Sequence, residues 1–322
     1  MTNTLKKNLK TILPIALGVF LVWYSYNATS PENRKQILFY IKEADVLWVS
    51  LSVLLGILGH VSRAIRWNYL LEPLGYQPKL KNNLLIILMS YFANLGIPRT
   101  GEVLRATALT TYEGVPFEKG FGTIVTERVI DVLMLLFIVL LALVLQTDVI
   151  VDVLQKKGID ITGILLLLGA ALIAGTVFIV FIKKSSNGIA IKIKTFVNGL
   201  LDGVFSIFKM KQKWSFVFHT LFIWGCYIGM LWVIKFTVPE TVVLTFSQLL
   251  VAFVAGAFAM ATTNGGIGLY PIAVSSALAI FGISSVAGDA FGWIIWISQT
   301  LMIVVFGAIS FLLLPLLNRN KQ

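Results

Sequence analysis

Residues 291–317 read Phe-Gly-Trp-Ile-Ile-Trp-Ile-Ser-Gln-Thr-Leu-Met-Ile-Val-Val-Phe-Gly-Ala-Ile-Ser-Phe-Leu-Leu-Leu-Pro-Leu-Leu, without a single charged side chain. This run exceeds the roughly 18 apolar residues that a helix needs to cross the hydrocarbon core of a bilayer. Residues 161–182 and 216–234 form further apolar runs of this kind. Because a helix satisfies its own backbone hydrogen bonds inside lipid, the sequence predicts an all-α, polytopic membrane helix bundle.

The composition of the whole chain supports this fold class. Hydrophobic residues make up 57% and charged residues 13% of the 322 positions, whereas a soluble domain carries roughly 25% charged residues. The formal net charge of +11 is typical of lysine and arginine retained in cytoplasmic loops, where they meet anionic headgroups. We therefore expect membrane lipid as a partner and no nucleic acid.

Catalytic and metal-binding patterns are missing from the sequence. Cys226 is the single cysteine, which excludes a disulfide framework and a thiolate metal site. His60 and His219 lie far apart, with no carboxylate cluster near either. There is no Ser/His/Asp set and no Walker-type loop. We expect no catalytic residues, no metal and no cofactor, and hence no enzyme.

Six stretches have the length and hydropathy of full crossings. They are residues 11–26, 45–62, 120–146, 160–182, 214–236 and 287–317. The first has the layout of a signal peptide without an obvious cleavage site, so we expect an uncleaved span. The prediction is a single integral membrane domain over residues 1–322.

Two further segments consist of an apolar half-helix, a polar break and a second half-helix. The first covers about 83–111 and breaks at Gly96-Ile-Pro-Arg-Thr-Gly101; the second covers about 246–281 and breaks at Thr262-Thr-Asn-Gly-Gly-Ile-Gly268. Neither half is long enough to cross the hydrocarbon alone. Irregular backbone at membrane depth needs protein or a watery cavity around it. Both segments are therefore predicted to be re-entrant hairpins.

The distribution of lysine and arginine gives the topology. If both chain termini are cytoplasmic and each hairpin returns to the face it left, most cations fall inside, including the basic loop 183–213. That loop is either a plain cytoplasmic loop or an amphipathic helix on the leaflet. The first hairpin then enters from the cytoplasm and the second from outside, like an inverted repeat around a midplane site. We expect a multi-pass protein of the bacterial inner membrane.

Charged side chains gather in three places along this apolar chain. They are Arg63 and Arg66; Arg99, Glu102 and Arg105; and Glu127, Arg128 and Asp131. Charges at membrane depth face a cavity or pair with each other. Arginine forks also match the oxygens of a lipid phosphate. The two interpretations are a phosphate site and a buried salt-bridge network.

The individual residues divide between these interpretations. We favour phosphate binding for Arg99 and Arg105, and a structural i, i+3 pair for Arg128 and Asp131. Glu102 belongs to the carboxylates that orient arginines or meet a cationic headgroup.

Two alternatives stay open for Arg63 and Arg66, which either bind the substrate or extend to the interface. Glu127, like Glu102 and Asp131, either orients an arginine or contacts the headgroup.

The second break is uncharged. Its glycines permit positive φ or close backbone approach, and plain helix packing is the alternative. Free N–H groups at the half-helix starts near Gly101 and Gly266 would attract an anion. The candidate binding residues here are Asn264, Gly265, Gly266 and Gly268.

Four motifs give the sequence a family resemblance. They are Arg63-Ala-Ile-Arg66-Trp67, Asn94 with Pro98-Arg99-Thr-Gly101-Glu102-Val103-Leu-Arg105, Glu127-Arg128 with Asp131, and Gly265-Gly266-Ile-Gly268. With these motifs the chain resembles the lysylphosphatidylglycerol synthase transmembrane-region family, also called flippase-like or UPF0104 proteins. The resemblance adds Asn94 to the candidate substrate-binding residues.

The resemblance implies a domain that, in the aminoacyl-phosphatidylglycerol members, moves the modified lipid between leaflets. Those members carry a further cytosolic aminoacyl-transferase domain, which we do not expect here because the sequence ends at Gln322. Tyr270-Pro271 stands where many relatives have an acidic residue. Another phospholipid, a polyprenyl-phosphate carrier and a glycolipid are therefore equally open as substrates.

The leading hypothesis is a protein that binds and translocates a phospholipid or a lipid-linked substrate. One rival is a membrane-embedded glycosyl- or lipid transferase with Glu102 or Asp131 as general base. The other is a non-transporting scaffold subunit for a partner lipid-modifying enzyme. A homo-oligomer is compatible with each of these.

Overall fold

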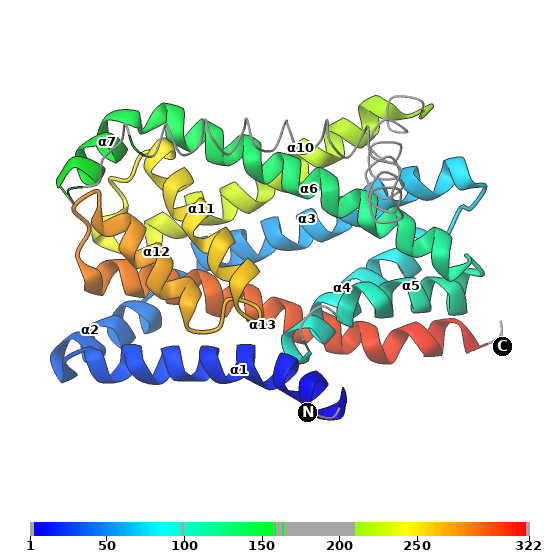
Figure 1. Ribbon diagram of the computed structural model, residues 1–322, viewed down its shortest axis with the longest axis horizontal. Helices are drawn as coiled ribbons and strands as arrows, with labels where there is room; N and C mark the ends of the chain where they lie inside the picture. The colour runs from blue at the N-terminus through cyan, green and yellow to red at the C-terminus, as the bar shows by residue number, and fades with distance from the viewer. Residues whose placement is uncertain (1–2, 98–99, 157, 159–162, 164–209, 320–322) are drawn as a thin grey trace.

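The computed structural model describes residues 3–97, 100–156, 158, 163 and 210–319 (Figure 1). All regular elements in these ranges are helices, which confirms the all-α prediction. The α-helices are α1 (Asn3–Ala28), α2 (Pro31–Lys42), α3 (Val46–Leu71), α4 (Leu80–Gly96), α5 (Thr100–Glu113), α6 (Phe117–Leu145), α7 (Thr147–Lys156), α10 (Lys213–Ile234), α11 (Phe246–Thr262), α12 (Leu269–Ala279) and α13 (Ser285–Leu317). Short 3-10 turns follow α3 at Glu72–Leu74 and α10 at Lys235–Thr237 and Pro239–Thr241.

Four helices in the described ranges are long and apolar enough to cross a membrane: α3, α6, α10 and α13, the first and third with their 3-10 extensions. They run along the long axis of the molecule (Figure 1), and α3 packs along α10. They match four of the six predicted crossings. Helix α1 contains the first predicted crossing, residues 11–26, but is not among these four helices, so that crossing stays a prediction. The crossing predicted at 160–182 and nearly all of the basic loop 183–213 lie outside the described residues.

Two helices, α2 and α7, were not predicted from the sequence. Residues 31–42 are too polar for a crossing, yet they form α2, which packs on α13. Its start is well defined, because the Ser30 hydroxyl accepts a hydrogen bond from the N–H of Asn33 and Pro31 occupies the first helical position. Ile37 anchors α2 in the apolar core.

The first predicted hairpin is present as α4 and α5, which pack against each other. A side chain at position 101 would collide with the Ser90 carbonyl and the Asn94 side chain, so only glycine allows the two helices to come this close. Asn94 Oδ1 accepts a hydrogen bond from the N–H of Gly101 at 2.7 Å. The hairpin therefore contains its own cap for the start of α5.

The second predicted hairpin is present as α11 and α12. Between them the chain turns through Gly265, Gly266 and Gly268, whose φ angles are 63°, 76° and 72°. These values lie in the left-handed region that side chains avoid, as expected for a glycine-rich break. Both halves of this hairpin pack closely, α11 on α12 and α12 on α13.

The tips of the two hairpins meet. Asn264 in the second break donates a hydrogen bond from Nδ2 to the carbonyl of Leu95, at the end of α4, over 2.6 Å. In Figure 1 the two hairpins start at opposite ends of the long helices and turn near the middle. Relative to the helix bundle they are thus opposed, as predicted. Their position in a bilayer stays a prediction.

The buried apolar side chains form separate clusters around the two hairpins. One cluster joins the start of α13, through Phe291 and Ile294, to α11, α12 and the end of α10. Another joins the end of α3, through Trp67, to Ile86 on α4 and Leu109 on α5. Each hairpin therefore has a packed base of its own, and the charged residues lie beside the first.

Candidate functional site

Three helices bring the predicted charged residues together. Each helix places two or three of them within one turn, on α3, on α5 and on α6. Contacts between opposite charges of 4 Å or less connect them all. We call this set the arginine–carboxylate network: Arg63, Arg66, Glu102, Arg105, Glu127, Arg128 and Asp131.

Glu127 is the centre of the network and has no exposed surface. Its Oε1 accepts a short hydrogen bond from Arg63, and Arg66 Nη2 lies 3.7 Å from the same oxygen. Arg105 donates to both carboxylate oxygens, at 3.1 and 2.9 Å. Such bidentate pairs are among the strongest polar contacts in proteins. One carboxylate therefore holds three arginines from two helices.

Asp131 lies one turn further along α6 and completes the pairing of the arginines from α3. It accepts hydrogen bonds from Arg63 at 2.8 Å and from Arg66 at 3.0 Å. Arg63 and Arg66 are only 2% and 0% exposed. The alternative in which they extend to the interface is therefore wrong, because both guanidinium groups are enclosed and paired inside the protein.

Arg105 also lies inside the protein. Its guanidinium carbon is 3.8 Å from the centroid of the Trp67 ring, and its two terminal nitrogens are both bonded to Glu127. Trp67 is itself fixed, since its Nε1 donates to Thr123 Oγ1 at 2.9 Å. The salt-bridge alternative thus describes the observed contacts of Arg105, and its phosphate contact stays a prediction.

Arg128 and Glu102 form the open edge of the network. Their side chains are 40% and 29% exposed, and Arg128 Nε lies 3.8 Å from Glu102 Oε1. Arg128 also lies 3.5 Å from Asp131, which confirms the predicted i, i+3 pair. Neither Arg128 Nε nor Glu102 Oε2 has a hydrogen-bond partner among the described residues.

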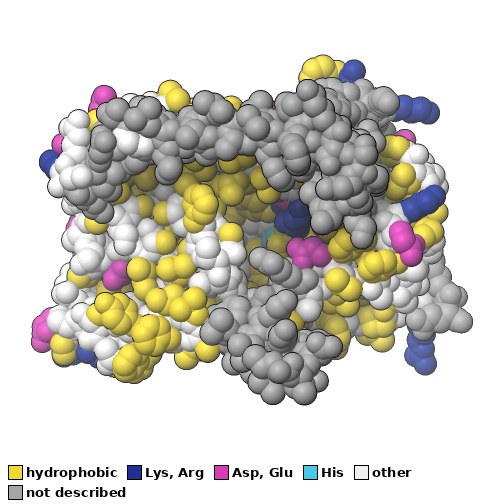
Figure 2. Space-filling view, viewed as in Figure 1, with side chains coloured by type: hydrophobic (Ala, Val, Ile, Leu, Met, Phe, Trp, Pro, Cys, Tyr) yellow, Lys and Arg dark blue, Asp and Glu magenta, His cyan; other side chains and the backbone are white. Residues whose placement is uncertain are grey.

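A cavity of about 370 Å³ lies beside Arg128 and Glu102. Its remaining lining is apolar: Phe121, Ile124, Val125, Val129, Val132 and Leu133. Figure 2 shows basic and acidic side chains next to each other near the middle of a largely apolar face. The surface of this cavity is apolar, and the charged groups of Arg128 and Glu102 lie beside it; this arrangement fits an amphipathic molecule.

The residues of the breaks have structural contacts. The N–H of Gly101, predicted to be free for an anion, is bonded to Asn94, so that expectation is wrong. The carbonyl of Gly265 accepts a hydrogen bond from Trp296 Nε1 at 2.8 Å, and a side chain at Gly268 would collide with the backbone of α1 at Gly18.

The residues of the second break, 264–268, are not bonded to the arginine–carboxylate network within the described ranges. Asn264 reaches Leu95, and within residues 3–97, 100–156 and 210–319 no hydrogen bond or ion pair joins residues 264–268 to the network. Gly266 lies with positive φ against Met260 and Tyr270. Arg99, a predicted phosphate ligand, lies outside the described residues.

Sequence reasoning missed the contribution of α10. Tyr227 Oη accepts a hydrogen bond from Arg63 at 3.0 Å, and Thr220 Oγ1 accepts one from Arg66 at 3.2 Å. Both are polar residues in an otherwise apolar span, and their i, i+7 spacing puts them on one helix face. This spacing was the signal that could have linked α10 to the arginines.

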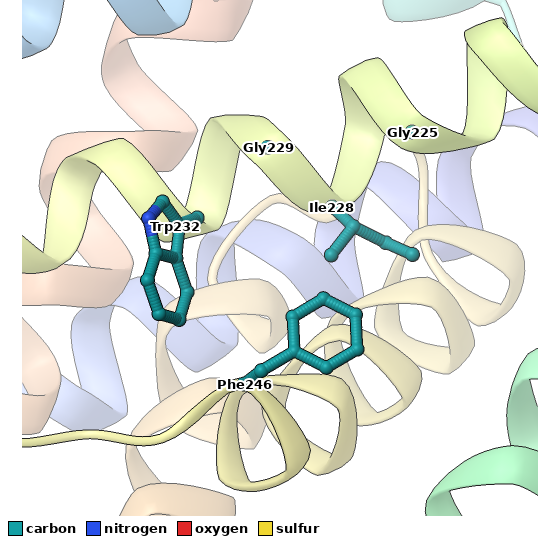
Figure 3. A pocket seen from close by; sticks show the side chains of 5 residues that line it. All are labelled: Gly225, Ile228, Gly229, Trp232 and Phe246. Atoms are coloured by element: carbon teal, nitrogen blue, oxygen red, sulfur yellow. The ribbon is translucent and has the colours of Figure 1, made fainter.

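A separate cavity of about 300 Å³ lies beside the second half of α10 (Figure 3). Ile228, Trp232 and the two glycines Gly225 and Gly229 line it from α10, and Phe246 closes it from the start of α11. It has no charged residue in its lining and therefore no group that would orient a headgroup.

The family model of the lysylphosphatidylglycerol synthase TM region matches residues 11–307. The chain belongs to this family. The resemblance inferred from the four motifs is thereby confirmed. Together with the four long apolar helices, the match identifies a multi-pass membrane protein.

Two curated relatives match shorter parts of the chain. A UPF0104 membrane protein from Methanocaldococcus jannaschii is 38% identical over 96 residues, which is 29% of this chain and 29% of the relative. The glycosyltransferase AglD from Haloferax volcanii is 26% identical over 126 residues, 39% of this chain and 19% of the relative. The chain thus covers less than a third of either relative. No solved structure matches it.

Proposed function

We propose that this membrane protein binds a phospholipid or lipid-linked substrate and moves it between the leaflets, with Arg128 as the contact for the headgroup phosphate. One observation carries the proposal. Among the arginines of the network, Arg128 alone is substantially exposed, and it borders a cavity of about 370 Å³ whose other walls are nearly all apolar.

The chemistry of the cavity fits a lipid phosphate. A guanidinium matches phosphate oxygens and stays charged at every relevant pH. Arg128 has three carboxylates at 3.5 to 3.8 Å and a side chain that is 40% exposed, so a ligand can reach it. The apolar wall formed by Val129, Val132 and Leu133 suits the start of an acyl or isoprenoid chain.

Translocation is supported by the two opposed hairpins. Broken helices that meet in the middle of a bundle are typical of transporters with a site near the midplane. We propose that α4–α5 enters from the cytoplasm and α11–α12 from outside, with both chain termini cytoplasmic. Both named relatives are archaeal, so we propose a cell membrane in general; the bacterial inner membrane stays a prediction.

The test removes the charge of Arg128. Arg128→Gln should reduce lipid movement in proteoliposomes by about tenfold or more, because the phosphate loses its charged partner. The fold should persist, since partly exposed ion pairs contribute roughly 0–1 kcal/mol. The transported lipid is first identified by mass spectrometry of lipids that co-purify, and its movement is then followed with a headgroup-labelled analogue.

Lys119→Gln is the matched control, because it removes a cation from the same helix at an exposed position near Tyr76. It should leave transport unchanged. Equal transport rates for Arg128→Gln and wild type would refute the assignment.

A second candidate, a membrane-embedded transferase, is favoured by Glu102. Its Oε2 is buried without a hydrogen-bond partner at the edge of the same cavity, and part of the chain is similar to a protein named as a glycosyltransferase. A carboxylate in this position is a candidate general base for an acceptor hydroxyl. Asp131 is less suited, since Arg63 and Arg66 occupy its oxygens.

The transferase is tested with a radiolabelled sugar-phosphate lipid as donor. Glu102→Gln should abolish sugar transfer if Glu102 is the base. Label transfer that is equal in the variant and in wild type, or absent in both, would dismiss this candidate.

A further inference from the structure

We infer that the cavity between α5 and α6 selects a lipid whose headgroup carries a single negative charge, one phosphodiester, and that Glu102 determines this selection. The inference rests on the proposed function, because it concerns the headgroup that Arg128 would bind. It specifies the charge class of the substrate and assigns a specificity role to one residue.

The first step is the charge of the network. Its contacts of 4 Å or less connect four arginines with three carboxylates. One positive charge is left without a counter-charge inside this connected set. The neighbouring titratable rings are Tyr227, whose hydroxyl accepts a hydrogen bond from Arg63, and His60, which is buried one turn from Arg63 on α3 with its ring centroid 4.9 Å from that of Tyr91.

The second step is the cost of that excess charge. Arg63, Arg66, Arg105 and Glu127 are at most 2% exposed, so water screens the set poorly and an unbalanced charge is expensive. A phosphodiester balances it with one negative charge. A zwitterionic headgroup leaves the excess in place, and a headgroup with an additional phosphate monoester, which adds roughly −1.5 to −2, over-compensates it.

The third step is the place where the excess charge is accessible. Arg63, Arg66 and Arg105 all donate hydrogen bonds to carboxylates. The carboxylate contacts of Arg128 are longer, 3.5 to 3.8 Å, and its side chain is 40% exposed. An incoming anion therefore meets the network at Arg128, beside the apolar cavity.

The fourth step identifies the residue that sets the charge. Glu127 and Asp131 each bond two arginines, so their loss would disrupt the network. Glu102 has one ion contact, at 3.8 Å to Arg128, and its Oε2 has no partner among the described residues. Glu102 thus contributes a negative charge at the cavity without holding the helices together.

The experiment compares lipids that differ in headgroup charge but share their chains. Purified protein in mild detergent is titrated with phosphatidylinositol, its 4-phosphate and phosphatidylethanolamine, and binding is measured by native mass spectrometry. Wild type should bind phosphatidylinositol about tenfold more tightly than either of the others, because one unbalanced charge in a poorly screened site has an effect of at least that size.

Glu102→Gln raises the excess to two positive charges. The preference should then shift toward the 4-phosphate by about tenfold or more relative to wild type. Glu118→Gln is the matched control: it removes a carboxylate from an exposed position in the first turn of α6 and should leave the preference unchanged.

The outcomes separate this inference from the proposed function. If wild type binds all three lipids equally and Arg128→Gln binds none of them, the charge selection is overturned. The proposal that Arg128 binds the lipid headgroup then still stands. No lipid binding by wild type overturns the proposed function. An unchanged preference in folded Glu102→Gln removes the role of Glu102. If that variant does not fold, the order of affinities in wild type still decides the charge selection.

Discussion

The two hairpins have the same shape and different chemistry. In both, a helix of moderate length breaks, turns and packs back on itself, and the two turns meet at Asn264 and Leu95. The first hairpin carries Glu102 and Arg105, which reach the charges of α6. The second has no charged residue between positions 246 and 281.

The difference shows two ways to hold irregular backbone in an apolar bundle. The first hairpin is fixed by directional ion pairs to α6, so its position depends on specific side chains. The second is fixed by backbone geometry, with three glycines at positive φ and the Trp296 indole bonded to the Gly265 carbonyl. The charges of the network therefore lie beside the first hairpin, and the second hairpin is neutral.

The largest loss of stability should follow from removing the central carboxylate of the arginine–carboxylate network. Glu127→Gln removes the counter-charge of three buried arginines, which should destabilise the protein by about 3–5 kcal/mol. The free energy of unfolding is measured by titration from mild detergent into SDS. Glu118→Gln, at the exposed start of α6, is the control. A loss below about 1 kcal/mol in Glu127→Gln would mean that the network does not hold the first hairpin.

An intermediate effect is expected in the neutral hairpin. Gly266→Ala places a Cβ at φ +76°, 2.6 Å from Met260 Sδ and 3.0 Å from Tyr270 Cβ, so we expect a destabilisation of roughly 1–3 kcal/mol. Gly225→Ala on α10 is the matched control, since nothing lies within 4 Å of the added methyl group. If both alanine variants unfold at the same SDS concentration, backbone geometry does not hold this break.

The smallest effect should come from the contact between the tips. Asn264→Ala removes the 2.6 Å hydrogen bond to the Leu95 carbonyl, worth about 1 kcal/mol. Hydrogen exchange of peptides that contain residues 263–268 should become faster. Asn27→Ala removes a comparable side-chain bond to the Trp23 carbonyl within α1. Unchanged exchange in Asn264→Ala, relative to this control, would show that the tips do not stabilise each other.

The sequence was sufficient for the outline of the fold. Clusters of glycine, proline and asparagine inside apolar runs located both breaks, because such clusters mark turns between helices. The membership of the network was also foreseeable, since charges in an apolar chain must find each other. Helix α2 was missed, although Ser30 followed by Pro31 is a regular helix start.

The sequence did not reveal which arginine faces outward. We expected Arg105 on a phosphate and a structural role for Arg128, whereas Arg105 is bonded to Glu127 and Arg128 borders the cavity. Glu127 and Arg128 are adjacent, so they point about 100° apart on the helix. The rotation of α6 about its axis decides which one turns inward, and that rotation depends on packing with α3 and α5. The roles of these residues stay predictions.

The bond between the tips has a consequence for the evolution of this chain. Its acceptor is the main-chain carbonyl of Leu95, which every amino acid at position 95 would supply. A change at position 264 therefore cannot be rescued by a matching side chain at position 95. This hydrogen bond will therefore leave no co-varying pair at positions 95 and 264 in related sequences, and contact inference from alignments will overlook it.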